Sequence, residues 1–557
     1  MTEPTIGRSI LRDSVAADRR DLAAASVLLM LHQAGEALVP VLVGVVIDKA
    51  VRGGAGTALL TWLAVLGLDF LMLSVCYRFG ARRTWLAEAR ADQRLRLRIT
   101  GRVLDPRGGA ELGHLPGALV NIAVGDAKRV ANLHLALPFG LAALAALIVA
   151  GIALLRISLP LGLLILLGTP PLLYLLRLLG KPLQRRSGPE QERAAQAAGV
   201  AADLVNGVRV LKGIGAEAAA VQRYTLTSQD ALTATLRAGR AQGWYQGAML
   251  AANGLFLALI ALVGGRLAAE GSISVGELVS AVGLAQFLLA PMNIFGRVVS
   301  SLAQARASAE RIASVLIAPH AADGGAGRPS EPVSGALRIR GLDGLDLDVP
   351  AGQLLGIVSP DPAVITTLLR CLNRESDLGS GSIELDGRAI TELDPAALRG
   401  AILVAAHDAE LFAGTLWENV TSAAHGRDPG AAMAAAQADE VAGTLADGVH
   451  SLISEQGRSL SGGQRQRVAL ARALAVDAPV LVLHDPTTAL DTVTEARIAG
   501  ALREVRAGRT TLVATTSPAL LAACDRVVAL DGGSVTADGS HAELLNSHDD
   551  YRTLVLA

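Results

Sequence analysis

The sequence predicts a multi-domain membrane protein in which an all-α domain of six transmembrane helices precedes an α/β domain. The chain has 557 residues, of which 51% are hydrophobic and only 18% charged, and its mean hydropathy is +0.42. This composition is too apolar for a water-soluble protein of this length. Long apolar runs fill the chain up to about residue 300, and short apolar runs typical of strands begin near residue 335.

Six apolar runs are long enough to cross a hydrocarbon core of ~30 Å. Arg and Lys gather in residues 80–102 and 180–196, which follow the second and the fourth run. The positive-inside rule therefore places these segments and both termini in the cytosol. The expected spans lie near residues 21–47, 57–82, 132–155, 158–180, 245–269 and 276–299.

The start of the chain contains neither an uninterrupted apolar core nor a small-residue cleavage site, so no cleaved signal peptide is expected. Residues 10–20 instead fit an interfacial helix that leads into the first span. Cys76, Cys371 and Cys524 lie far apart without metal-ligand spacing and are interpreted as packing thiols. The basic residues follow the membrane topology, so we expect no nucleic-acid partner. Heavy use of Ala, Gly, Leu and Arg points to a bacterial genome of high GC content.

Long connections separate the second span from the third and the fourth from the fifth. Both are charged and helical in pattern, so the membrane helices are expected to continue into the cytosol and to return after short turns. Residues 105–126 and 206–217 are the candidate turns. A Gly-, Pro- and Ala-rich segment follows the last span. The predicted organisation is therefore a membrane domain over 1–317, a linker over 318–334 and the α/β domain over 335–557.

Beyond the linker, short apolar strands alternate with helical segments. This alternation favours an α/β domain with a largely parallel sheet. The predicted strands have the sequences LRIRGL, LLGIVS, GSIELDG, AILVAA, VLVLHD, TTLVAT and RVVALDGG.

The stretch SLSGGQRQRVALARAL, residues 459–474, is the most specific in the chain. Ser461, Gly462 and Gly463 open an amphipathic helix, whose free N–H groups and dipole favour an anion. The two glycines allow a phosphate to approach the backbone closely. Taken alone, these residues also fit a glycine-rich cap on a basic helix.

LSGGQ (460–464) followed by VLVLHDPTTALD (480–491), after six spans and two long connections, resembles an ATP-binding cassette (ABC) half-transporter with the exporter-type membrane fold. The resemblance covers nearly the whole chain. It implies ATP and Mg²⁺ as cofactors, a P-loop-type nucleotide-binding domain, and coupling helices in the two cytosolic turns, the second of which crosses to the partner. It also implies contact with the γ-phosphate of ATP held by the other nucleotide-binding domain, made by the signature residues Leu460, Ser461, Gly462, Gly463 and Gln464.

A phosphate-binding loop needs glycines, a lysine for the β- and γ-phosphates and a hydroxyl for Mg²⁺. At the corresponding places Thr366 keeps the hydroxyl and is the candidate Mg²⁺ ligand, whereas Ile365 replaces the lysine. Charge-assisted hydrogen bonds of about 1.5–3 kcal/mol each are lost with that lysine. Pro362 and Val364 replace glycines, and Pro362 also removes an amide donor. The residues of this degenerate phosphate loop are Ser359, Ile365, Thr366 and Thr367.

The resemblance also assigns the remaining catalytic positions. His484 stands where the family has its magnesium-organising Asp, and Asp485 where it has its catalytic Glu. Asp485 keeps the charge but is shorter by one methylene, and a general base must come within about 2.6–3.2 Å of its proton. His407 stands at the Q-loop glutamine and Thr516 at the switch histidine. No aromatic residue occurs in 335–349 to stack on adenine.

The positions that face a neighbouring domain keep the family pattern, namely the signature, Glu455 and the D-loop stretch that ends at Asp491. The sequence therefore predicts the degenerate subunit of a heterodimeric exporter of a small molecule, lipid or peptide. Its partner would be a second half-transporter with an intact phosphate loop and catalytic Glu. Its own site is expected to hold nucleotide weakly or without hydrolysis. Two alternatives remain: an importer of a siderophore-like metal chelate with the same membrane fold, and a membrane regulator that hydrolyses no ATP.

Glu36 and Asp69 lie within expected spans and are candidates for the substrate pathway. Acidic residues inside a membrane tend to face a cavity and to be functional. A carboxylate at the water-filled outer end of the pathway, or one paired with a neighbouring helix, would fit the same sequence. His32 lies one turn from Glu36 and is a candidate partner for it.

Overall fold

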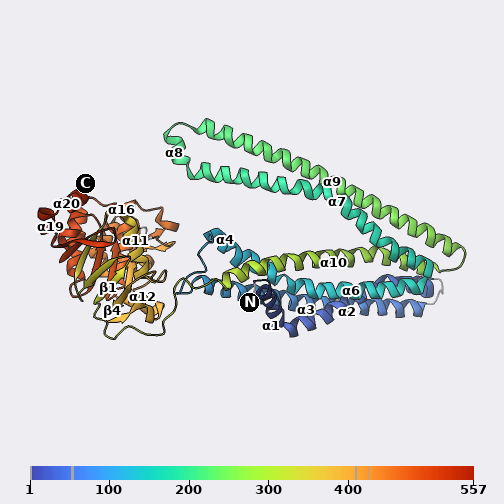
Figure 1. The fold of residues 1–557 in the computed structure, drawn as a ribbon. Coiled ribbons are helices and arrows are strands. Elements are labelled where there is room, and N and C mark those ends of the chain that lie inside the picture. Colours follow the sequence, from blue (N-terminus) through green and yellow to red (C-terminus); the bar gives the residue numbers. More distant parts are fainter. Residues whose placement is uncertain (1–2, 52–55, 408–409, 425, 557) are drawn as a thin grey trace. The chain divides into compact units, whose positions relative to one another are not determined.

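The computed structural model describes residues 3–51, 56–407, 410–424 and 426–556. Their contacts divide the chain into two compact units, each described by itself below. The helical unit consists of 1–99 and 117–314, and the α/β unit of 100–116 and 315–557 (Figure 1).

The described residues contain six helical stretches that are long and apolar enough to cross a membrane. Each overlaps one of the six expected spans. A shorter helix, α1 (Glu3–Ala17), precedes the first of them. The stretches are Arg19–Lys49, Gly56–Val103, Pro116–Ile157, Leu159–Lys181, Glu217–Ala269 and Val275–Leu316. The helices that form them are α2 (Arg19–Val45), α3 (Gly56–Val103), α4 (Pro116–Asn121), α5 (Ala127–Ala131), α6 (Leu133–Ile157), α7 (Leu159–Asn206), α9 (Glu217–Ala269) and α10 (Val275–Leu316).

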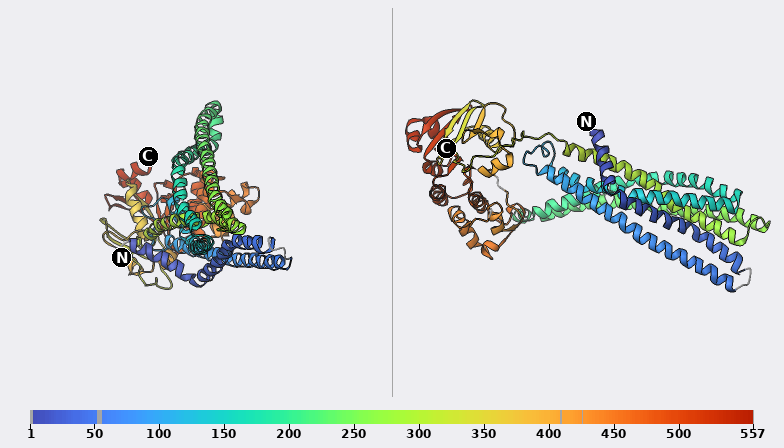
Figure 2. Two further views of the ribbon diagram at one scale, coloured as in Figure 1. Left: turned by 90° about the vertical axis from the view of Figure 1, so that its right-hand side faces the viewer. Right: turned by 90° about the horizontal axis from the view of Figure 1, so that it is seen from below.

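Helices α3, α7 and α9 are much longer than a membrane requires. At 1.5 Å per residue, the 48 residues of α3 span about 72 Å, more than twice the ~30 Å hydrocarbon core. Helices α7 and α9 run side by side and are joined at their far end by the short helix α8 (Val208–Gly213), as Figures 1 and 2 show. The charged connections of the sequence are therefore continuations of the membrane helices.

Small residues let the membrane helices approach closely, as is common in membrane proteins. Gly44 of α2 and Gly276 of α10 face each other, and a side chain on either would overlap the carbonyl oxygen of the other. Asp48, in a π-helical turn that continues α2 over Val46–Val51, accepts a hydrogen bond from the Gly276 N–H at 2.9 Å. The two helices are thereby fixed at one end.

The segment expected to be a linker is held in place within the α/β unit. The carbonyl oxygen of Arg107, in the first cytosolic turn, accepts hydrogen bonds from the N–H groups of Ala321 and Ala322, both at 3.1 Å. Arg102 donates to the carbonyl oxygen of Ala318 at 2.8 Å. The first turn and the residues after α10 therefore form one local structure.

All seven predicted strands are present in the α/β unit. The main sheet has the strand order β12-β11-β3-β10-β9-β6, in which β12 alone runs antiparallel to its neighbour. A separate antiparallel sheet has the order β2-β1-β4-β5, and β7 pairs with β8. The strands are β1 (Leu337–Leu342), β2 (Leu345–Val349), β3 (Leu354–Val358), β4 (Ser382–Leu385), β5 (Arg388–Ala389), β6 (Ile402–Ala405), β7 (Gly414–Thr415), β8 (Leu452–Ile453), β9 (Val480–His484), β10 (Thr510–Ala514), β11 (Arg526–Asp531) and β12 (Ser534–Gly539).

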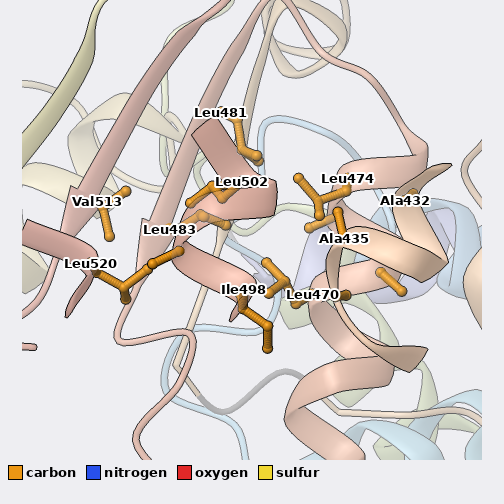
Figure 3. Close-up of a cluster of buried hydrophobic side chains, with 14 of the residues drawn as sticks. Ala432, Ala435, Leu470, Leu474, Leu481, Leu483, Ile498, Leu502, Val513 and Leu520 are labelled. Atoms are coloured by element: carbon orange, nitrogen blue, oxygen red, sulfur yellow. The ribbon is translucent and has the colours of Figure 1, made fainter. Parts of the chain in front are cut away.

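Alternate side chains of the parallel strands enter two different cores. Leu481 and Leu483 of β9 pack with residues of α14, α16, α17 and α18, as Figure 3 shows. Val480 and Val482 point to the opposite core, which contains α11 and the antiparallel sheet. The helices of this unit are α11 (Pro362–Leu372), α12 (Pro395–Ala401), α13 (Leu416–Thr421), α14 (Gly430–Ala435), α15 (Ala438–Thr444), α16 (Gly462–Ala475), α17 (Thr492–Val505), α18 (Pro518–Ala523), α19 (His541–Ser547) and α20 (Asp549–Leu556).

Candidate functional site

The predicted catalytic positions gather at the carboxyl edge of the six-stranded sheet, where parallel α/β sheets bind ligands. His484 ends β9 and lies beside Ala514 of β10. His407 and Thr516 each follow a parallel strand by two residues. One edge of the sheet therefore carries three of the altered positions.

His407, His484 and Asp485 lie close together. The two imidazole rings are 5.9 Å apart between centroids. His407 Nδ1 lies 3.4 Å from the carbonyl oxygen of Asp485, and His484 Nε2 lies 3.8 Å from its Oδ2. Within the described residues, no group of three His, Cys, Asp or Glu side chains could hold a metal ion. Thr516 is exposed, and no hydrogen bond joins it to Asp485 in the part of the chain described here.

A cleft of about 420 Å³ separates this edge from helix α16. His407 and His484 line one side of it, and Gln466 lines the other. Gln466 also ties α16 to the segment after β9, because its amide donates to Thr488 Oγ1 at 2.7 Å and accepts from the Ala489 N–H at 2.8 Å. The start of α16 is therefore held at a fixed distance from the D-loop.

The signature forms an ordered start to α16. Ser461 is the N-cap and accepts a hydrogen bond from the Gln464 N–H at 3.3 Å, while Gln464 Oε1 accepts from the Ser461 N–H at 2.9 Å. This reciprocal pair is a capping box. Leu460 anchors the loop in the core with 6% of its surface exposed. The N–H groups of Gly462 and Gly463 make no hydrogen bond to any described residue, so they remain available to an anion.

The degenerate phosphate loop is folded into helix α11. The helix begins at Pro362, and Asp361 is its N-cap, accepting a hydrogen bond from the Ala363 N–H at 2.8 Å. The Val364 N–H bonds the Asp361 carbonyl oxygen at 3.3 Å, and the Ser359 hydroxyl donates to the same oxygen at 3.1 Å. The donors that a phosphate would need are therefore engaged, and a carboxylate stands at the helix end.

The residues after the cap differ in their surroundings. Ile365, at the lysine position, is 5% exposed and packs in the core beside the antiparallel sheet. The Thr366 hydroxyl donates to the Pro362 carbonyl oxygen at 2.9 Å. Thr367 lines a small cavity described below. Thr366 and Thr367 both keep a hydroxyl oxygen, a ligand type suited to Mg²⁺.

Asp491 has a structural role at the end of the D-loop. Its carboxylate caps α17 by accepting hydrogen bonds from the N–H groups of Thr494 and Val493 at 2.9 and 3.1 Å. These bonds, that from Thr494 first, hold the pKa of Asp491 below its usual value. Glu455 is exposed in a short 3₁₀ turn ahead of the signature.

Two features that shape this region, a helix cap and a tight turn, were not predicted from the sequence. Asp361 was not assigned a role, although an Asp followed by Pro is a strong helix-start signal. The Asp343–Gly344 pair forms a two-residue hairpin between β1 and β2, with both residues at positive φ, 47° and 94°. Asp-Gly between two apolar runs is the signal for such a turn.

Glu36 and Asp69, the candidates for the substrate pathway, lie near the contact between α2 and α3. Gln33 donates a hydrogen bond to Glu36, and His32 Nε2 lies 3.8 Å from Glu36 Oε2. Asp69 packs against Gly35 of α2, and its Oδ2 is buried without a hydrogen-bond partner among the described residues. The proposed pairing of His32 with Glu36 is thus present, whereas Asp69 has an unsatisfied carboxylate oxygen.

The second cytosolic turn presents apolar side chains to the surface. They surround α8 and belong to a segment whose neighbours are charged. The exposed fractions are 70% for Val205, 48% for Val208, 65% for Val210 and 72% for Ile214.

Comparison with known proteins identifies both units. Residues 22–292 match the profile described as the ABC transporter transmembrane region, and residues 342–488 match the profile described as ABC transporter. An ATP-dependent lipid A-core flippase of Cupriavidus pinatubonensis is 30% identical over 412 residues, which is 69% of this chain and 68% of the flippase. A multidrug efflux ATP-binding/permease protein of Mycobacterium tuberculosis is 29% identical over 544 residues, 93% of this chain.

The structure of a bacterial Atm1-family ABC exporter with ATP bound has the same fold, with a TM-score of 0.72 at 23% identity. It is covered over 98% of its length, and this chain over 97%. The chain therefore belongs to the ABC transporter family, as a transmembrane domain of the exporter fold joined to an ABC domain. It spans only 44% of the mycobacterial protein.

Proposed function

We propose that this chain is the degenerate subunit of a heterodimeric ABC exporter that couples ATP binding and hydrolysis to outward transport. Its signature completes an ATP site whose phosphate loop, Mg²⁺ ligand and catalytic Glu belong to the partner. This chain's own site does not hydrolyse ATP. The nucleotide-binding domain lies in the cytosol.

The contrast between two helix N-termini of the ABC domain carries the proposal. Helix α16 is capped by the neutral hydroxyl of Ser461 and leaves the N–H groups of Gly462 and Gly463 available. Helix α11 is capped by the carboxylate of Asp361, and its first amides are engaged. An anion is favoured at the first N-terminus and repelled at the second. The intact end is the one that the family presents to a partner's ATP.

The altered catalytic positions support the same conclusion. His484 and Asp485, at the positions of the family's magnesium-organising Asp and catalytic Glu, lie 3.8 Å apart between Nε2 and Oδ2. Two copies of this chain would share these changes and would leave both signatures facing impaired sites. A partner with an intact phosphate loop and a catalytic Glu would give this chain's signature a competent ATP site to complete.

The apolar side chains around α8 support a partner as well. Val208, Val210 and Ile214 are apolar, yet 48%, 65% and 72% of their surfaces are exposed. An apolar cluster at a cytosolic turn is suited to dock on another protein surface. We assign this surface to the partner's ABC domain, where closure of the two domains would move α7 and α9 together.

The relatives support an amphiphilic cargo. The curated proteins that match are described as multidrug efflux and lipid A-core flippase proteins. A small molecule, lipid or peptide is therefore the proposed substrate class. Glu36 and Asp69 would lie along its route.

ATPase activity in the presence and absence of the partner tests the proposal. The chain purified alone should show negligible activity, and the complex with its partner should show robust activity. Ser461→Ala in this chain should lower the activity of the complex roughly tenfold or more, because a hydrogen bond to a charged phosphate contributes about 1.5–3 kcal/mol. Ser540→Ala is the matched control, since it removes the same capping box from α19, far along the chain from the signature.

Robust hydrolysis by the chain alone would overturn the proposal, because His484 and Asp485 would then support catalysis. Equal losses from Ser461→Ala and Ser540→Ala would show that only helix stability was affected.

A further inference from the structure

We propose that this chain's own nucleotide pocket takes no ATP, so the heterodimer holds one ATP per cycle instead of two. The inference rests on the proposed heterodimer but goes beyond loss of hydrolysis. At the phosphate end residues of this chain oppose an anion, and at the adenine end no ring is placed to stack on the base.

The phosphate end is closed by charge and by geometry. The Asp361 carboxylate caps α11 and accepts a hydrogen bond from the Ala363 N–H at 2.8 Å. The next amide, of Val364, is bonded to the Asp361 carbonyl oxygen, and Pro362 has no N–H to offer. An incoming triphosphate would meet a negative charge and find these donors engaged.

The lysine position reinforces the closure. Ile365 is not merely uncharged: it lies in the core, 5% exposed, among apolar residues such as Leu355 and Leu369. A side chain that leaves this position for the pocket would leave a hole in that core. At the position where the family binds the β- and γ-phosphates, helix α11 therefore places a side chain in the core.

The adenine end lacks a platform. Strands β1 and β2 are joined by Asp343 and Gly344 alone, with Leu342 paired directly to Leu345. So short a turn has no room for a loop that could place a ring on adenine. Gly533 packs against the carbonyl of Asp343 and has no space for a side chain. The turn is thus fixed from two sides.

A small cavity of about 160 Å³ remains between the two ends within this chain. Leu342, Val364 and Leu368 give it apolar walls, and Asp343 and Asp361 contribute the carboxylates. The two carboxylates disfavour the negatively charged phosphates of a nucleotide.

Equilibrium binding of radiolabelled ATP with Mg²⁺ to the purified heterodimer tests the inference. The partner's catalytic Glu is replaced by Gln to prevent hydrolysis. We expect one ATP per heterodimer. Ala363→Trp fills the cavity from an exposed position, and it should leave the number of bound ATP molecules at one and their affinity within twofold of that of the unsubstituted heterodimer.

Two ATP molecules per heterodimer would overturn the inference, and a fall from two to one in Ala363→Trp would place the second molecule in this pocket. If Ala363→Trp does not fold, the count in the unsubstituted heterodimer still decides. Ser461→Ala separates the two proposals. A weakening of ATP binding by this change together with a count of two would refute the inference alone, and no weakening would refute the proposed function.

Discussion

Asp361 and Ser461 have the same local role and opposite consequences. Both are N-caps whose side chains accept a hydrogen bond from the first turn of a helix, and Asp and Ser stabilise helices about equally in this position. They differ in charge, which decides whether an anion can share the helix end. Under the proposed function, the choice of cap therefore affects ATP binding more than it affects the fold.

At this scale the sequence predicted that Ser461, Gly462 and Gly463 open a helix, because these residues are adjacent in the chain. It did not predict the burial of Ile365 or the hydrogen bonds of Thr366, since these depend on packing against a distant sheet. The sequence therefore showed which chemical groups the phosphate loop lacks, but not how the loop is folded.

Asp386 should make the stability of the ABC domain depend on pH. Burial alone would raise its pKa, but hydrogen bonds from the Ser334 hydroxyl and from the N–H groups of residues 334–336 lower it below the usual value. A lowered pKa in the folded state stabilises the fold above the unfolded pKa of about 3.9, and this stability is lost as the pH falls through the folded value.

We therefore expect Asp386→Asn to lower the free energy of unfolding by about 1–3 kcal/mol at pH 7, with a smaller loss below pH 4. Thermal unfolding of the purified chain over this pH range measures the difference. Asp531→Asn, at an exposed position, is the control. An equal effect of the two substitutions would contradict the assignment.

Among the elements, the long helices were the easiest to predict and the short strands the hardest. Apolar runs fix the membrane helices because nothing else satisfies the backbone in lipid. Strand β2 alternates Leu with Asp, a residue that strands disfavour, and it forms because it pairs with β1. Residues 318–322 belong to the predicted linker over 318–334, and their hydrogen bonds near Arg107 were not predicted because these partners are remote in sequence.

The apolar surface around α8 predicts that coupling depends on it. Ile214→Glu should uncouple ATP hydrolysis from transport, because a charge would oppose burial against the partner. Val221→Glu is the matched control on α9, where the valine is similarly exposed at 64%. Transport per ATP hydrolysed, measured in proteoliposomes, should fall severalfold for Ile214→Glu only. Unchanged coupling would mean that this surface does not dock.

We expect the carboxylates of Glu36 in α2 and Asp69 in α3 to contribute to transport but not to ATP hydrolysis. Asp69→Asn and Glu36→Gln remove charge at positions where the membrane makes it costly. We expect at least one of them to reduce transport severalfold, with the basal ATPase activity of the heterodimer unchanged. Transport and ATPase assays on the same vesicles decide, and normal transport by both variants would remove these residues from the pathway.

For the whole molecule, the topology can be tested with cysteines because the native ones are protected. Cys76, Cys371 and Cys524 are buried, and burial raises the pKa of Cys524 to about 12. Thiols of this kind react slowly. Introduced cysteines on exposed turns should therefore dominate labelling.

Ser272→Cys, between α9 and α10, should react with a membrane-impermeant maleimide in intact cells. Lys212→Cys, in α8, should react only after the membrane is opened, because the positive-inside rule places that turn in the cytosol. Labelling of both from outside, or of neither, would contradict the six-span topology.

The docking of the segment after α10 on the first cytosolic turn has a consequence for biosynthesis. Arg102 donates a hydrogen bond to the carbonyl oxygen of Ala318, and the two residues are 216 positions apart in the sequence. At 5–20 residues per second, a ribosome needs roughly 10–40 s to make that stretch. The first turn therefore cannot form these hydrogen bonds until every membrane helix has been synthesised. Protease sensitivity at this turn would distinguish nascent chains from completed ones.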